Sequence, residues 1–108
     1  MVHCSKEISW SDPQQVHTQV LSPGITAKTI WKADNKAKAM VVEFEPGAKW
    51  EGIDLHEPGP EEVFVLSGVF NDGNRDFREG DFIHNPAGSF HIPQSRAGCR
   101  LFLFFPEG

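Results

Sequence analysis

Two short segments of the sequence carry side chains that bind metal ions. The first reads Asp54-x-His56-x4-Glu61, and the second ends in His91 after a turn that contains Pro and Gly at residues 86–88. Imidazole nitrogens and carboxylate oxygens are the donors that proteins offer to Zn, Fe, Mn and Ni ions. We therefore expect one site for a single divalent transition metal, with Asp54, His56, Glu61 and His91 as the ligands.

The spacing of these residues decides which side chains can meet. Asp54 and His56 lie two residues apart, so both project from the same side of an extended strand. Adjacent residues project to opposite sides, so only one of Glu61 and Glu62 can enter the interior of a barrel. We assign Glu61 to the site, and Glu62 and Glu57 are the alternatives to it.

The remaining histidines are weaker candidates for ligands. His3 and His17 lie in the irregular N-terminal part of the sequence and have no carboxylate at ligand spacing. His84 lies within an expected strand and is interpreted as a surface residue or as part of the barrel mouth. No catalytic residue is assigned, although Glu62 and His84 are candidates for a supporting role.

Short apolar segments separated by Gly and Pro predict the elements that must position these ligands. Such segments, rich in Val, Ile, Phe and Trp, are typical of an all-β sandwich or barrel. Residues 1–23 form the least regular part, an N-terminal arm with at most one helical turn at residues 11–15, and residues 24–108 form the barrel domain. Strands are expected at residues 25–32, 37–45, 49–56, 61–70, 77–84 and 100–105, with a hairpin turn at residues 71–74.

Two of these strands are apolar on both faces. Residues 63–66 and 101–105 are all Val, Leu or Phe, whereas a strand with one face in water alternates apolar and polar residues. The second face must therefore be covered, either by the N-terminal arm or by a second subunit. We expect a homodimer, because twofold dimers are the most common oligomers. Trp50 and Phe82 are expected to line the barrel.

Composition argues against several classes of partner. The 108 residues carry a net charge of −5, and Lys and Arg are scattered singly, so we expect no nucleic-acid partner. The longest apolar run, at residues 101–105, is far too short to cross a bilayer, so we expect no membrane partner. Cys4 and Cys99 are interpreted as reduced thiols of a cytoplasmic protein.

The two ligand segments resemble the two sequence motifs of the cupin superfamily of RmlC-like jelly rolls. The first motif is G-x5-H-x-H-x3,4-E-x6-G. Residues 47–68 match it with one additional residue after Gly47 and with Asp54 in place of the first histidine. The second motif is G-x5-P-x-G-x2-H-x3-N. Residues 80–91 match it up to the histidine, and Ser95 stands in place of the final Asn.

Longer stretches are similar to one branch of that superfamily, the cupin domain of the zinc-binding ChrR-like anti-sigma factors. The resemblance implies a cupin double-stranded β-helix over about residues 24–105. It also implies that His56, Glu61 and His91 are metal ligands and that Asp54 takes the place of the first histidine. A carboxylate there favours Mn(II) or Fe(II) over Zn(II), or weakens binding because Asp is shorter than His. The stretches that carry this similarity are residues 46–48, 61–70, 85–91 and 98–102.

Three functions are compatible with these patterns. We expect a metal-dependent small-molecule enzyme of the dioxygenase-like, isomerase-like or hydrolase-like kind, in which the metal binds oxygens of the substrate. The alternative is a non-catalytic metal- or ligand-binding sensor module related to the ChrR anti-sigma cupin domain. The third is a cupin that has lost its metal site through Asp54. The expected partner is a small-molecule ligand or substrate.

Overall fold

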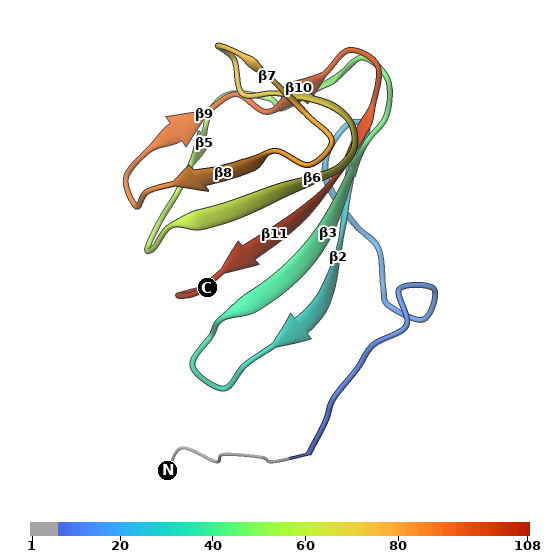
Figure 1. The fold of residues 1–108 in the computed structure, drawn as a ribbon, viewed down its shortest axis with the longest axis vertical. Coiled ribbons are helices and arrows are strands. Elements are labelled where there is room, and N and C mark those ends of the chain that lie inside the picture. Colours follow the sequence, from blue (N-terminus) through green and yellow to red (C-terminus); the bar gives the residue numbers. More distant parts are fainter. Residues whose placement is uncertain (1–6) are drawn as a thin grey trace.

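Strands and turns make up the regular structure of residues 7–108, which are the residues that the computed structural model describes (Figure 1). No helix occurs among these residues, and in particular none that is long and apolar enough to cross a membrane. The predicted all-β class is therefore confirmed. The strands are β1 (Gln19–Ser22), β2 (Ile25–Lys32), β3 (Lys38–Phe44), β4 (Ala48–Lys49), β5 (Asp54–Leu55), β6 (Glu61–Asn71), β7 (Asp76–Arg78), β8 (Phe82–Asn85), β9 (Phe90–His91), β10 (Gln94–Ser95) and β11 (Cys99–Phe105).

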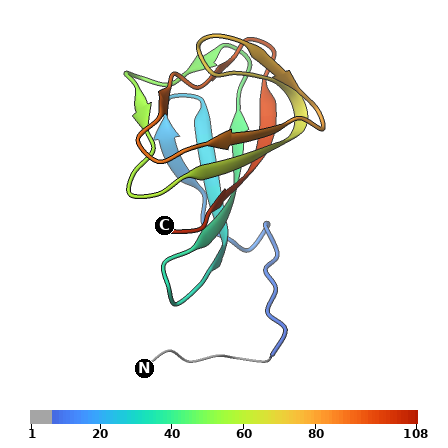
Figure 2. The same ribbon diagram turned by 60° about the vertical axis from the view of Figure 1, so that its left-hand side comes forward.

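The strands form a curled antiparallel sheet that nearly closes into a barrel (Figure 2). Its order is β1-β2-β3-β11-β6-β10-β4, and β7 and β8 also pair with β6. A separate two-stranded sheet joins β5 to β9. The long strand β6 connects the two ends of the barrel, because its first half pairs with β8 and its second half pairs with β7 and β10.

An irregularity in β6 sets the curvature at the centre of the sheet. Arg100 pairs with Ser67 but Leu101 pairs with Val65, so one additional residue bulges from β6. The nearby Gly68 has a φ of +76°, and a Cβ at this position would lie 2.2 Å from Gly98 O, in the loop that precedes β11. A glycine inside a strand often marks a bulge or the close approach of another backbone, and both occur here.

Alternating residues of the sheet point inward and form the core. Cross-strand register places them in rows, so that Leu101 lies between Val42 and Val65, and Leu103 lies between Met40 and Val63. The buried cluster consists of Ile25, Ala27, Met40, Val42, Phe44, Val63, Val65, Phe70, Cys99, Leu101 and Leu103. Several of these side chains also line a cavity that extends to β5 and β9.

The strand predictions were correct where periodicity extends over many residues and wrong where it does not. The strands predicted at residues 25–32 and 61–70, and the hairpin at residues 71–74, are present. The single strand predicted at residues 49–56 is instead the two short strands β4 and β5, because Gly52 adopts a φ of +85° between them. The strand predicted at residues 77–84 likewise divides into β7 and β8 at a turn around Gly80.

The N-terminal arm lies largely apart from the barrel. Residues 7–18 run away from it in both views (Figures 1 and 2), and Ile8 and Trp10 are 89% and 87% exposed. The predicted helical turn is only a hydrogen-bonded turn, in which Gln15 N donates to Asp12 O over 2.9 Å. Strand β1 falls inside the range predicted as irregular, because its Gln-Val-Leu-Ser sequence gives no clear alternation.

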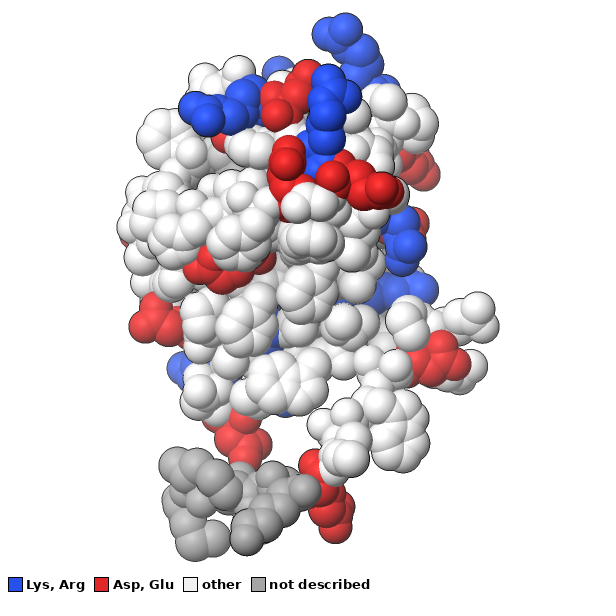
Figure 3. All heavy atoms as spheres, viewed as in Figure 1, with Lys and Arg blue, Asp and Glu red and all other residues white. Residues whose placement is uncertain are grey.

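Part of the outer face of the sheet is apolar and exposed to solvent. Phe82 was predicted to line the barrel, but it pairs with Phe64 on the outside and is 63% exposed. Phe64 itself is 41% exposed, and its other neighbour is Phe102. The middle of the face seen in Figure 3, over β6 and β11, carries few charged side chains. The arm contacts this sheet near β2, where Lys28 Nζ donates to Pro13 O.

Candidate metal centre

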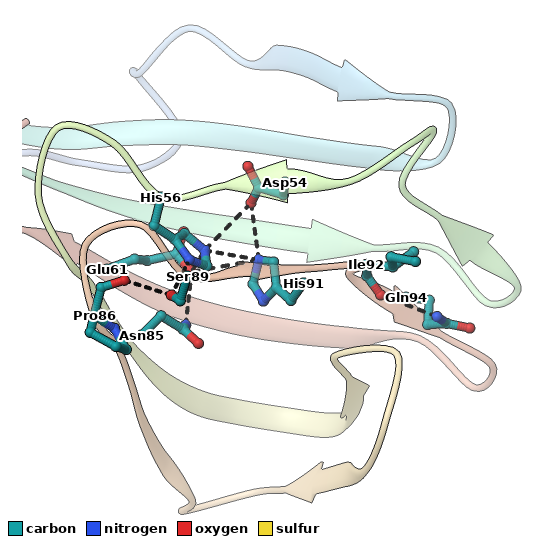
Figure 4. Close-up of polar contacts among 9 residues, drawn as sticks. All are labelled: Asp54, His56, Glu61, Asn85, Pro86, Ser89, His91, Ile92 and Gln94. Carbon is teal, nitrogen blue, oxygen red and sulfur yellow. Dashed lines mark hydrogen bonds and ion pairs between the residues drawn. The ribbon is translucent and has the colours of Figure 1, made fainter.

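Asp54, His56, Glu61 and His91 come together at one end of the barrel (Figure 4). Each offers a ligand atom, and these atoms all lie within 4.8 Å of one another. Strand pairing explains two of the positions, because Asp54 on β5 is directly opposite His91 on β9. Glu61 is the first residue of β6, and a short loop connects it to His56. The four side chains predicted from spacing are therefore neighbours in space.

The distances between the four donors fit a bound metal ion. His91 Nε2 lies 3.0 Å from Asp54 Oδ2 and 3.1 Å from His56 Nε2, and His56 Nε2 lies 3.3 Å from Glu61 Oε1. Two longer separations, His56 to Asp54 and His91 to Glu61, are both 3.9 Å. Donors about 2.1 Å from a metal lie about 3.0 Å apart at a right angle and about 3.4 Å apart at the tetrahedral angle. The observed spacings bracket these values.

Ser89 fixes the tautomer of His56. The Ser89 hydroxyl donates its proton to Pro86 O over 2.6 Å, so toward His56 Nδ1, 2.9 Å away, it acts as an acceptor. His56 Nδ1 therefore carries a hydrogen, and in the neutral ring Nε2 keeps a lone pair directed at the cluster. This is the arrangement of a metal-binding histidine, whose other nitrogen donates to a fixed acceptor.

The carboxylates set the protonation of His56. Burial by itself lowers the pKa of this ring, but the hydrogen bond and charge of Glu61 and the charge of Asp54 outweigh burial and raise the pKa above 6.5. A divalent cation would take the place of the proton at Nε2, because both are positive charges held by the same two carboxylates. The chemistry of this donor set therefore fits a metal.

Two further polar groups complete the surroundings of the cluster. Asn85 Nδ2 donates to Glu61 Oε1 over 3.2 Å, which holds the carboxylate in place from the opposite strand. His91 Nδ1 is buried and has no hydrogen-bond partner among the described residues. Ser89 and Asn85 were missed by sequence reasoning. The only signal was their position inside the second motif, on either side of the turn at residues 86–88.

The alternatives to the four residues lie elsewhere. Glu62 projects to the outer face, where it contacts the exposed ring of His84 through Nδ1. This pair is thus separated from the cluster by the sheet itself. Glu57 and His17 are exposed, and His3 lies outside the described residues.

The cluster forms part of the wall of an internal cavity. The cavity has a volume of about 480 Å³, and Asp54, His56, Glu61 and His91 all line it. Asp54 is the most accessible of the four, with 29% of its side chain exposed, whereas the other three are buried. Trp50 lines the cavity as predicted, together with apolar side chains that include Met40, Val42, Val63, Leu101 and Leu103. Concave apolar space beside a few polar groups is the usual form of a small-molecule site.

Comparison with known proteins confirms the predicted fold and the resemblance to ChrR. A family model described as the ChrR cupin-like domain matches residues 6–106. The comparison with curated proteins finds no match.

Three solved structures illustrate the likeness. An RmlC-like cupin from Shewanella frigidimarina is 18% identical with a TM-score of 0.80, over 94% of this chain and 93% of its own. The polyketide cyclase RemF from Streptomyces resistomycificus is 18% identical with a TM-score of 0.78, and the match covers 94% of this chain and 81% of RemF. A chain of the complex between SigE and the anti-sigma factor ChrR from Rhodobacter sphaeroides is 22% identical with a TM-score of 0.71, and the match covers 84% of this chain and 50% of that chain. At these identities the likeness concerns the fold.

Proposed function

The chain belongs to the family of ChrR cupin-like domains, and we propose that it is a metal-dependent enzyme acting on a small oxygen-containing molecule. Asp54, His56, Glu61 and His91 would hold one divalent transition metal. The observation that carries the proposal is that this four-donor cluster opens onto an internal cavity with apolar walls. A purely structural site would be closed off by packed side chains instead.

The metal would act as a Lewis acid toward oxygen atoms of the substrate, or would activate dioxygen, as divalent metals do in such sites. The chain's own residues supply the rest. Ser89 and Asn85 orient two of the ligands, which keeps the cluster ready before the substrate enters. Trp50 and the apolar wall favour a substrate with an apolar part.

Two carboxylates and two imidazoles are compatible with Fe(II), Mn(II), Zn(II) and Ni(II). The carboxylates would neutralise the two charges of the metal, so the loaded cluster would be close to neutral. A substrate could therefore approach without a strong electrostatic barrier.

A sensor module is the second candidate, and the uncovered outer face of the sheet favours it. The exposed Phe64 and Phe82 form one apolar row with the half-buried Phe102, and a second copy of the chain would bury this row. The proposal therefore includes a cytoplasmic homodimer, whose contacts would change on ligand binding if the protein is a sensor. Sedimentation velocity on the wild type and on Phe82→Glu tests the dimer: we expect the variant to dissociate, and a monomeric wild type would exclude it.

Elemental analysis of protein purified without added metal or chelator tests the metal site. We expect about one equivalent of transition metal in the wild type and its loss in His91→Ala. The matched control is His84→Ala, which removes an exposed imidazole on the other side of the sheet and should retain the metal. A wild type that stays free of metal after incubation with Mn, Fe and Zn salts would refute the proposal.

Water-proton relaxation of the Mn(II)-loaded protein separates the two candidates. Rapidly exchanging water at the metal would favour the enzyme, because a substrate could then reach the ion. A metal shielded from water would favour the sensor.

A further inference from the structure

The cavity contains a cationic side chain that the metal site does not use. Lys38, the first residue of β3, points inward beside Phe105 and is half-buried. Its Nζ lies 5.1 Å from the centre of the Phe105 ring. It is the only Lys or Arg among the described residues that line the cavity. No carboxylate of the described part of the chain forms an ion pair with it, whereas Arg100 on the outer face is paired with Glu43.

Strand register gives the distance between Lys38 and the metal cluster. Lys38 is opposite Phe105 on β11, and on the other side of β11 the pairing of Phe104 with Glu62 places Glu61 next to Phe105. Neighbouring strands lie about 4.8 Å apart, so the backbones of Lys38 and Glu61 are about 10 Å apart. Both residues line the same cavity, so a ligand with a short carbon chain is of the right size to contact both.

The walls between these two groups are apolar. Met40 and Leu103 form the next inward row above Lys38 and Phe105. Among the described residues that line the cavity, the other charged side chain outside the cluster is Glu57, which is exposed at the rim. Gly108 also lines the cavity, and no ion pair is found between its carboxylate and Lys38 in the described part of the chain. A partly buried ammonium group facing an aromatic ring lacks the anionic partner that such groups normally have.

We infer that Lys38 determines substrate specificity by binding a carboxylate at the far end of a short, metal-chelating acid. This inference rests on the proposed function, since the near end of the molecule would be held by the metal through two oxygens. The loaded cluster carries little net charge, so Lys38 is the group that distinguishes an anionic substrate from a neutral one. The middle of the molecule would lie against Met40 and Leu103.

Two hydroxamates of equal length test the inference. Butyrohydroxamate and succinic acid monohydroxamate share the same chelating group, but the second has a carboxylate where the first has a methyl group. Their dissociation constants would be measured by calorimetry on Zn(II)-loaded wild type, Lys38→Met, Lys38→Arg and Lys32→Met, after the metal content of each has been determined. Lys32→Met is the matched control, because Lys32 pairs with Lys38 across the strands but does not line the cavity.

We expect the wild type to bind the carboxylate probe roughly tenfold or more tightly than the methyl probe, as a hydrogen-bonded charge pair provides. Lys38→Met should lose this preference, whereas Lys38→Arg and Lys32→Met should keep it. Equal binding of the two probes by the loaded wild type, or a preference that persists in Lys38→Met, would overturn the inference alone. Binding of neither probe would show that a chelating ligand does not reach the metal, and it would overturn the proposed function together with the inference. A wild type that binds no metal would overturn the proposed function and this inference with it.

Discussion

Replacing Ser89 by Ala should weaken metal binding without removing any ligand. The hydroxyl of Ser89 accepts a hydrogen bond from His56 Nδ1 and donates one to Pro86 O. In its absence, the neutral ring can move its proton to Nε2, where Glu61 Oε1 lies 3.3 Å away as an acceptor. The ring then presents a proton to the cluster where a metal would need a lone pair.

The structure sets the size of both effects. Loss of a supporting hydrogen bond to a metal-binding histidine typically lowers metal affinity about 10- to 100-fold, or about 1.4–2.8 kcal/mol. Because His56 is only 4% exposed, Nδ1 would have no hydrogen-bond partner in either tautomer, which also costs about 1–3 kcal/mol of folding stability. The variant should therefore lose both affinity and stability, and the affinity loss should persist at temperatures where it remains fully folded.

Competition titration against a chelator of known Zn(II) affinity measures the first effect, and urea unfolding of the metal-free protein measures the second. Ser95→Ala is the control, because Ser95 is buried and its hydroxyl donates to Val69 O but lies outside the cluster. It should lose stability and keep metal affinity. If Ser89→Ala binds Zn(II) as tightly as the wild type, the proposed role of Ser89 in fixing the tautomer is wrong.

Three further predictions concern other parts of the molecule. The pKa of His56 is raised in the fold, so protonation of this ring stabilises the metal-free protein fully below pH 6.5, and the contribution is lost as pH rises through the raised pKa. Metal affinity increases over the same pH range, because the metal competes with the proton. The melting temperatures of the metal-free and metal-loaded protein should therefore change with pH in opposite directions. Burial raises the pKa of Cys99 to about 11, so in a Cys4→Ser variant Ellman's reagent at pH 8 should label this thiol only after unfolding. Gly68→Ala should lower the free energy of unfolding by more than the roughly 1–3 kcal/mol of left-handed backbone strain, because the added Cβ would also clash with Gly98 O. Gly80→Ala should lower it only by that strain, because its Cβ would meet nothing within 4 Å. Equal losses in urea unfolding would contradict the close approach at Gly68.

The sequence predicted the long strands because they alternate over many residues. It failed at residues 49–56 and 77–84, where a glycine with positive φ divides an apparently continuous segment. It also placed Phe82 inside the barrel. A single apolar residue carries no information about its side of the sheet until the register with β6 is known.

Candidate site residues could be predicted because two motifs with fixed spacing carry them. The parity argument correctly separated Glu61, which is buried, from Glu62, which lies outside. Ser89 and Lys38 could not be found in this way. Ser89 matters through a hydrogen bond to a residue 33 positions away, and Lys38 matters only because the sheet brings β3 within two strands of β6.

The place of Asp54 in the cluster follows from strand pairing, and this bears on whether the site has been lost. A shorter side chain would fail to reach the other ligands if it stood where a histidine normally does. Here, however, the β5–β9 pair holds Asp54 directly opposite His91, and the carboxylate lies 3.0 Å from Nε2. A lost site would have no reason to keep two carboxylates and two imidazoles in contact, since His56, Glu61 and His91 are buried and burial of such polar groups lowers folding stability. The geometry therefore favours a metal site adapted to a second carboxylate over a degenerate one.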